Sequence, residues 1–283
     1  MTGTVLMAVL MGALMHASWN ALVKSSPDKL LDTALIHLLC SVVALPFVFY
    51  FGLPSPSAWP FLGLSMVIHL GYYFALAGAY QHGELGLAYP LMRGTAPLLV
   101  ALSSTAWLGE ALALQGWVGV ALVCCGVLAL GSGAGMVQHR KAVVFALSNA
   151  VLIAAYTVVD AQGVRASGDV APYVALLFAL DGWPFALMVF CRRQGQVWGY
   201  VHHRWPLALG GAVASIGSYA IALWAMTVAP VAVVAALRET SVLFAAILGA
   251  WLLKESWTRS RLLGTLSIVT GVVLLRFSPP APL

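Results

Sequence analysis

Charged residues are scarce in this chain of 283 residues: Asp, Glu, Lys and Arg make up 8% of it, whereas hydrophobic residues make up 61%. Soluble globular domains contain about 25% charged residues, and the mean hydropathy of +0.94 is also far on the apolar side. We therefore expect an integral membrane protein. Most of the Lys and Arg behind the net charge of +5 fall in short gaps between apolar runs, so this charge implies no nucleic-acid partner.

Cysteines and catalytic motifs are also sparse. The four cysteines lie in or beside apolar runs without metal-type spacing, so we interpret them as packing residues. No GxxxxGK[ST], HExxH or CxxC sequence occurs, which leaves ATP-driven pumping by this chain and zinc catalysis without support, and no cofactor is expected. The first apolar run lacks a positive n-region and a cleavage site, so we expect a span and not a removed signal peptide.

Long apolar runs divide the chain into ten candidate spans. A helix needs about 20 apolar residues to cross a bilayer, and the gaps between the runs are too short to hold a soluble domain. The predicted fold is all-α, an integral membrane protein with ten transmembrane helices. The expected spans are 3–23, 30–50, 58–80, 85–108, 111–131, 141–162, 170–191, 205–227, 229–253 and 258–276.

The second half of the chain repeats the first. At one constant offset, spans four and five match spans nine and ten: Arg93 pairs with Arg238, Glu110 with Glu255, Gly119 with Gly264 and Gly126 with Gly271. Because each half has an odd number of spans, the second half must enter the membrane inverted, as in secondary transporters with a site between inverted repeats. We expect a first five-helix repeat at 1–131, a linker at 132–140, a second repeat at 141–276 and a tail at 277–283.

Some matched residues are interpreted as structural. Glu110 and Glu255 stand at short interhelix turns, where a carboxylate favours the positive N-terminal end of the next span. The glycines of spans five and ten are seven residues apart on one helix face, so these two spans can approach closely through their backbones.

Two sequences at the ends of spans are similar to those of a known family. WLGE (Trp107–Glu110) ends span four, LLKE (Leu252–Glu255) ends span nine, and a glycine-bearing span follows each. Over essentially its full length the chain resembles the EamA-type proteins of the drug/metabolite transporter superfamily. The resemblance implies a ten-helix, multi-pass carrier of a cell membrane, such as a bacterial inner membrane. It also implies transport of small metabolites, commonly export, but it names no substrate.

The orientation of the chain has two conflicting predictions. Lys and Arg concentrate in the gaps after odd-numbered spans, and only Arg165 and Arg276 lie on the opposite side. The positive-inside rule then places both termini outside the cytoplasm, which we favour, whereas the resembled family is usually described with both termini inside. The residues on the charged side are Lys24, Lys29, Arg140, Lys141, Arg192, Arg193, Arg204, Lys254, Arg259 and Arg261.

Polar and aromatic residues share helix faces in four spans, because residues three or four apart lie on one side of a helix. Together they favour a cavity that binds a small organic solute, although aromatic belts and polar helix contacts give a similar pattern. The candidate substrate-binding residues of these faces are His16, Trp19 and Asn20 in span one, His69, Tyr72 and Tyr73 in span three, Tyr156 and Asp160 in span six, and Tyr219 in span eight.

The two repeat-related arginines are the strongest candidates, because a charge within a span is costly and marks a function or a pairing. Arg93 lies in YPLMRGTAP, which starts with a further candidate, Tyr89. A guanidinium fork suits a carboxylate, a phosphonate or a zwitterion, while the alternative is that each arginine braces helices or pairs with an acid. We expect Arg93, whose neighbour Gly94 leaves room for a ligand, to bind the anion, and Arg238, beside Glu239, to be paired within the protein.

Asp181 and Glu239 are the candidate coupling residues, because a proton-coupled carrier needs a group that titrates during transport. The alternative is that each only neutralises an arginine. Asp160 lies near a span end, where it could face water.

The favoured function is a secondary carrier that moves an amino-acid-like solute or an organic anion by alternating access, in the direction of export, with the proton as a possible coupling ion. The alternatives are a membrane-embedded enzyme using His16, Asp181 and Arg238, and a passive channel or lipid translocator. We do not expect an enzyme, because these three residues are scattered among separate spans. The expected partners are the solute and the lipid bilayer, and the sequence leaves a monomer and a homodimer open.

Overall fold

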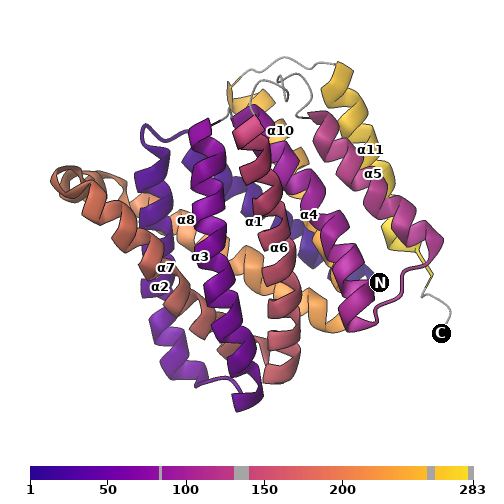
Figure 1. The fold of residues 1–283 in the computed structure, drawn as a ribbon, viewed down its shortest axis with the longest axis horizontal. Helices are drawn as coiled ribbons and strands as arrows, with labels where there is room; N and C mark the ends of the chain where they lie inside the picture. The colour runs from indigo at the N-terminus through magenta and orange to yellow at the C-terminus, as the bar shows by residue number, and fades with distance from the viewer. Residues whose placement is uncertain (83–84, 131–139, 254–258, 280–283) are drawn as a thin grey trace.

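The computed structural model describes residues 1–82, 85–130, 140–253 and 259–279, and this part of the chain is almost entirely helical (Figure 1). Each of the ten predicted spans is a helix, and the ninth is divided in two. The helices are α1 (Gly3–Lys24), α2 (Lys29–Phe51), η1 (Pro56–Ala58, a 3₁₀ turn), α3 (Trp59–His82), α4 (Leu85–Leu108), α5 (Leu114–Leu130), α6 (Arg140–Ser167), α7 (Val170–Arg192), α8 (Gln194–Val228), α9 (Val231–Arg238), α10 (Thr240–Leu253) and α11 (Arg259–Phe277).

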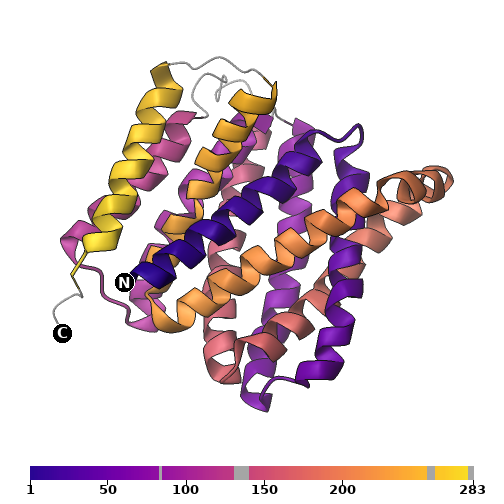
Figure 2. The ribbon, with the colours of Figure 1, turned by 180° about the vertical axis from the view of Figure 1, so that it is seen from behind.

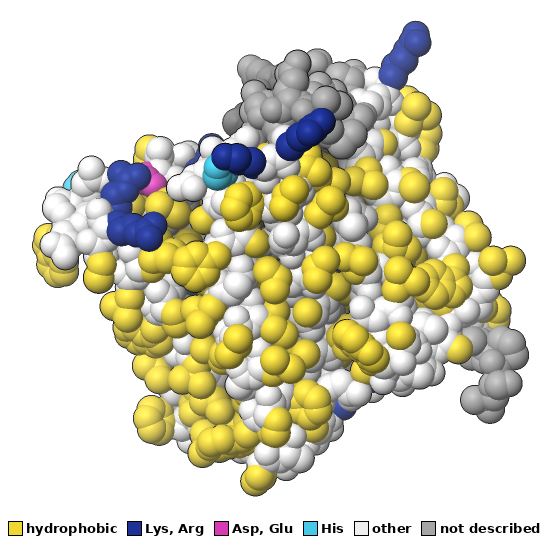
Figure 3. All heavy atoms as spheres, in the orientation of Figure 1, with side chains coloured by type: hydrophobic (Ala, Val, Ile, Leu, Met, Phe, Trp, Pro, Cys, Tyr) yellow, Lys and Arg dark blue, Asp and Glu magenta, His cyan; other side chains and the backbone are white. Residues whose placement is uncertain are grey.

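The outside of the bundle is suited to lipid. Six of the described helices, α1, α2, α3, α6, α7 and α8, are long and apolar enough to cross a membrane by themselves, and α5 and α11 are shorter apolar helices. Hydrophobic side chains cover the sides of the molecule (Figure 3), while the core is rich in Ala and Val. Small buried residues let helices approach closely, which is how helices associate where lipid is as apolar as the core.

The packing of the helices follows the inverted repeat. The repeat makes α1, α2 and α3 equivalent to α6, α7 and α8, α4 equivalent to the pair α9–α10, and α5 equivalent to α11. Equivalent helices make equivalent contacts: α1 packs on α8 as α6 packs on α3, and α2 packs on α8 as α7 packs on α3. Helix α2 also packs against its own counterpart α7, and α5 against α11. Figures 1 and 2 show α5 and α11 side by side at one edge, and Figure 2 shows α1 beside α8. Two inverted five-helix repeats therefore interlock along a shared interface.

Helices α5 and α11 meet through glycines. A Cβ atom added at Gly126 would lie 2.7 Å from the carbonyl oxygen of Gly264, and one added at Gly271 would lie 2.7 Å from that of Gly119. Side chains do not fit at this distance, so the predicted close approach of spans five and ten is confirmed. The crossed pairing, with Gly126 opposite Gly264 and Gly119 opposite Gly271, is the one that antiparallel helices require.

Several helix ends differ from the prediction. Helix α8 begins at Gln194, inside the gap predicted before span eight. In this added part of α8, Tyr200 and Arg204, one turn apart, both bind Asp32 of α2: the hydroxyl donates to Oδ1 (2.8 Å) and Arg204 Nη2 to Oδ2 (2.5 Å). Helix α5 starts only at Leu114, after the turn containing Gly109. The predicted linker 132–140 lies outside the described residues except for its last residue. The last two residues of LLKE (254 and 255) and residues 280–283 of the tail also lie outside them.

Candidate functional site

Arg93 of α4 faces Glu239, the residue between α9 and α10. Arg93 Nε lies 3.0 Å from Glu239 Oε2, and the two side chains are 9% and 4% exposed. The two atoms are close but not aligned for a hydrogen bond, so Arg93 Nε and Nη2 and Glu239 Oε2 have no hydrogen-bond partner among the described residues. Buried donors of this kind are costly when left unused. The acid neutralises Arg93 while leaving guanidinium donors for a further acceptor.

The ninth span is interrupted at Glu239, directly after Arg238 at the end of α9. The N–H of Glu239 bonds to the carbonyl oxygen of Ala236 (3.1 Å), only three residues back, and the Thr240 hydroxyl donates to the carbonyl oxygen of Leu237 (2.7 Å). Hydroxyl side chains compete with the regular helical bonds in this way. Discontinuous helices at the repeat interface are typical of transporter binding sites. Sequence reasoning missed this break, although the polar run RETS within an apolar span was a signal for it.

Arg238 packs against an aromatic ring. Its Cζ lies 5.2 Å from the centre of the Tyr219 ring, a distance typical of a cation–π contact. Arg238 forms no ion pair with another residue of the described chain. The expectation that Arg238 is the paired arginine is therefore wrong, and the acid pairs with Arg93 instead. Adjacent helical residues point about 100° apart, so Glu239 turns away from its neighbour.

Gly94 does not open a space beside Arg93. A Cβ atom added at Gly94 would lie 2.7 Å from Leu128 Cγ and 3.2 Å from the carbonyl oxygen of Cys124. The glycine lets α5 pack against the α4 backbone, so the expectation that it leaves room for a ligand is wrong. A ligand must reach Arg93 from another side.

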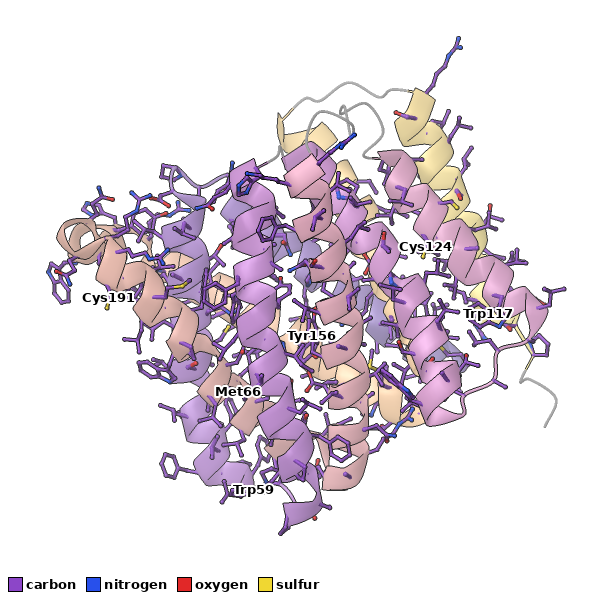
Figure 4. The ribbon with its side chains drawn as sticks, in the orientation of Figure 1. Trp59, Met66, Trp117, Cys124, Tyr156 and Cys191 are labelled. Carbon is purple, nitrogen blue, oxygen red and sulfur yellow. The ribbon has the colours of Figure 1, made fainter. Side chains whose placement is uncertain are left out.

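Aromatic rings continue from Arg238 across the repeat interface. The Tyr219 ring lies 6.3 Å from that of Tyr156 of α6, which stacks on His69 of α3 at 4.4 Å and meets Tyr72 edge-on at 5.9 Å, all between ring centres. Figure 4 shows Tyr156 near the middle of the bundle. The structure thus brings together four predicted residues from three helices of both repeats.

His16 and Tyr89 complete the surroundings of the arginines. His16 interacts electrostatically with Arg93 and Arg238, and Tyr89 with Arg93 and Glu239. We call the whole group the arginine–aromatic cluster. Its members are His16, His69, Tyr72, Tyr89, Arg93, Tyr156, Tyr219, Arg238 and Glu239.

The remaining candidates of span one bond within their own helix. Trp19 Nε1 donates to His16 Nδ1 (3.3 Å), and Asn20 Nδ2 donates to the carbonyl oxygen of His16 (2.8 Å). The predicted shared face is therefore present, and Trp19 fixes the orientation of the His16 ring.

Tyr73 and Asp181 form a second cluster with His37 and Phe185. The Tyr73 hydroxyl donates to Asp181 Oδ2 (2.6 Å) and lies 3.3 Å from His37 Nδ1, while its ring stacks on Phe185 at 4.7 Å between centres. Asp181 forms no ion pair with an arginine among the described residues. Of the three residues named for an embedded enzyme, Asp181 therefore belongs to this second cluster, whereas His16 and Arg238 belong to the arginine–aromatic cluster.

Asp160 is fully buried, contrary to the expectation that it lies near a span end facing water. Helix α6 continues beyond it to Ser167, and Asp160 is 0% exposed. Its Oδ1 accepts a hydrogen bond from the Tyr173 hydroxyl (2.8 Å), and its Oδ2 accepts one from Tyr219 (2.5 Å). Sequence reasoning missed Tyr173, which stands near the start of span seven, where Asp169 is the polar residue one turn before it.

An ion-pair network joins the two repeats at the end of the bundle that we call the Glu110 end. Glu110 Oε1 accepts from Arg165 Nη2 (2.5 Å) and Oε2 accepts from the N–H of Val231 (2.7 Å), while Arg165 Nε and Nη2 donate to the carbonyl oxygen of Met226 (3.0 and 2.7 Å). Glu110 therefore caps α9 of the other repeat, and not the next span as the sequence suggested.

A second network joins the repeats at the opposite end, which we call the Asp32 end. It consists of Asp32 with Tyr200 and Arg204, and the Tyr200 hydroxyl is also 2.7 Å from that of Ser26. Lys and Arg gather at this end of the molecule (Figure 3). The bundle is thus bridged between repeats both above and below the arginine–aromatic cluster.

Two cavities lie away from this cluster. One of about 710 Å³ is lined by Met1, Thr2, Thr4, Val5, Trp224 and Val228. The other, of about 490 Å³, lies among α2, α7 and α8. The arginine–aromatic cluster lines neither of these two cavities. Within it Arg93, Tyr156 and Glu239 are buried, whereas the other members are half-buried. The described residues contain no group of three His, Cys, Asp or Glu placed to hold a metal ion.

Ten helical spans in two inverted repeats, with charged residues buried where the repeats meet, define the class of membrane transporters built on inverted repeats. The family model described as the EamA-like transporter family matches residues 3–132 and, a second time, residues 140–277. The chain belongs to this family. It is a multi-pass membrane protein, as the resemblance implied, and one match falls on each repeat.

Solved structures share the fold. Among 29 matching chains, one titled "Crystal structure of protein" superposes with a TM-score of 0.78 over 97% of this chain and 96% of that chain, at 18% sequence identity. This likeness supports the fold alone. No protein with a curated description matches the chain.

Proposed function

We propose that the chain is a secondary carrier that exports a small polar or zwitterionic metabolite, amino-acid-like or an organic anion, by alternating access. The favoured setting is a bacterial inner membrane. The observation that carries this proposal is the buried Arg93–Glu239 pair, in which guanidinium donors are left without acceptors between the two repeats.

The charge balance of the cluster favours an anionic group on the solute. Arg93 and Arg238 both lie in the arginine–aromatic cluster, and Glu239 is its only acid among the described residues. Arg238 is half-buried and has no ion-pair partner among the described residues, so a carboxylate or phosphonate of the solute would supply its counter-charge. The rings of Tyr156 and Tyr219 would pack against the rest of a small organic molecule.

The two inter-repeat networks favour alternating access. A carrier must open its site to one side at a time, so contacts between the repeats at each end have to break in turn. The Glu110 end and the Asp32 end both hold such contacts. Glu110 binds the N-terminus of α9, which ends at Arg238, so movement at the cluster would act directly on this network.

Counterflow into proteoliposomes tests the proposal. Amino acids, organic acids, amines and phosphonates are first screened by thermal shift of the purified chain, and the solutes that stabilise it are preloaded. A carrier gives transient accumulation of labelled solute, whereas a channel gives only equilibration. Recovery of a chemically altered solute would instead identify an enzyme. Removal of an exposed arginine, Arg192→Gln, is the matched control and should leave counterflow intact.

Proton coupling is proposed to use Asp181 or Glu239. If either acid carries the proton, replacing it by Asn or Gln removes the titrating group, and the rate of counterflow should lose its dependence on pH. The measurement is the counterflow rate across a pH series for each variant. Unchanged profiles in both variants would favour sodium coupling or exchange.

A further inference from the structure

The environment of Asp160 is unusual for a carboxyl group in a membrane protein. It is 0% exposed, and each of its oxygens accepts one phenolic hydrogen bond, from Tyr173 of α7 and from Tyr219 of α8. Asp160 has no ion-pair partner within the described part of the chain. A buried acid without a cation is costly as an anion, so binding a proton is the simplest way to relieve it.

A histidine stands beside the carboxyl group. His69 of α3 and Ser65, one turn before it, are both electrostatic neighbours of the Asp160 carboxyl. The His69 Nδ1 donates to the Ser65 carbonyl oxygen (2.9 Å), because a carbonyl can only accept, and this bond fixes the orientation of the ring. The groups that face Asp160 are thus His69 and Ser65 from α3, Tyr173 from α7 and Tyr219 from α8.

Tyr219 connects this acid to the arginines. Its hydroxyl donates to Asp160, while its ring lies 5.2 Å from the Arg238 guanidinium. Arg238 is adjacent to Glu239, which pairs with Arg93. A solute that draws Arg238 away from the ring would therefore free Tyr219 to move, and Asp160 would lose one of its two hydrogen bonds.

We propose that Asp160 is a proton-binding site of the carrier, and that Tyr219 links its protonation to the occupancy of the arginine–aromatic cluster. The inference rests on the proposed carrier function and adds a third acid to Asp181 and Glu239. The proton comes from water and returns to water, bound in between to a carboxyl oxygen of Asp160, and Tyr219 keeps its own proton. Arg165 lies five residues further along α6, about 7.5 Å away, so opening of the Glu110 end would admit water to this acid.

Infrared difference spectroscopy of the full chain in nanodiscs, titrated with acid and base alone, tests the site without any solute. The wild type should show a carboxyl C=O band that appears on protonation, and Asp160→Asn should lose that band while Asp181→Asn retains it. Tyr219→Phe keeps the ring beneath Arg238 but removes one hydrogen bond to the carboxylate, so the band should persist with its midpoint shifted. Tyr173→Phe should shift the midpoint in the same direction.

The outcomes separate this inference from the carrier proposal. A band that survives Asp160→Asn, or that is absent from the wild type, would overturn the proton site even if counterflow works. If Asp160→Asn does not fold, the two tyrosine variants decide, and unshifted midpoints in both would contradict the proposal. Loss of counterflow with the expected spectra would instead refute the carrier and leave the proton site standing.

Discussion

Arg93 and Arg238 occupy equivalent positions in the two repeats, but their surroundings differ. Arg93 lies within α4, which stays one helix despite its two prolines, and it contacts Glu239. Arg238 ends α9 at an interruption and lies over the Tyr219 ring. The inverted repeat therefore preserves the position of the arginines along the chain but not their partners.

The residue after each arginine explains the difference. In the alignment of the two repeats Gly94 has the position that Glu239 has in the second repeat, so only the second repeat has an acid after its arginine. Gly94 lets α5 pack closely against α4, and Glu239 pairs with Arg93 of the first repeat. One acid for two arginines makes the charge of this interface asymmetric.

The largest expected effect comes from removing the acid. Glu239→Gln leaves Arg93 buried without its counter-charge, and breaking a buried pair in this way costs about 3–5 kcal/mol. Equilibrium unfolding of the purified protein in detergent would measure the loss. If Arg93 is already stabilised by other groups, the variant would be as stable as the wild type.

A double variant sharpens this result. Arg93→Met with Glu239→Met replaces both charges by apolar groups of similar length, so stability should return to near that of the wild type. Solute binding should still be lost, because the Arg93 guanidinium is gone. Restored stability with restored binding would show that the pair only braces the helices.

Changing the chemistry of Arg93 while keeping its charge has a smaller effect. Arg93→Lys retains the cation beside Glu239 but removes the planar fork, so we expect solute binding to weaken by about 1–3 kcal/mol with little change in stability. Binding is measured by thermal shift and calorimetry with the solute that counterflow identifies. The matched variant Arg238→Lys should weaken binding less, and the reverse order would transfer the anion-binding role to Arg238.

The smallest effect concerns the contact between Arg238 and Tyr219. A double-mutant cycle with Arg238→Gln and Tyr219→Leu should give a coupling of about 0.5–2 kcal/mol in unfolding free energy, the range of a cation–π contact. A coupling indistinguishable from zero would mean that the two groups are neighbours without a stabilising interaction.

The general architecture could be predicted from the sequence because it depends on long patterns. Apolar runs, the odd number of spans and the repeat of glycines each extend over many residues, and lipid leaves few folds for such a chain. The crossed packing of Gly119 and Gly126 on α11 follows from the same repeat. Helix periodicity also correctly grouped His69 with Tyr72, whose ring centres lie 6.3 Å apart.

The pairing of charges could not be predicted, because it depends on contacts between distant segments. Glu239 meets Arg93 of α4, which belongs to the other repeat, and not its own neighbour Arg238. Likewise Glu110 reaches the N-terminus of α9 and Tyr173 reaches Asp160 only through tertiary packing. Sequence spacing gives the face of a helix, and the partner on the next helix comes from the fold.

The most direct test of the account is a structure of the protein with its transported solute bound. The account predicts that the anionic group of the solute accepts a hydrogen bond from Arg93 Nη2 at about 2.7–2.9 Å, with the aromatic rings of Tyr156 and Tyr219 against the remainder of the molecule. A solute remote from Arg93, with the guanidinium bonded only to protein carboxylates, would contradict it.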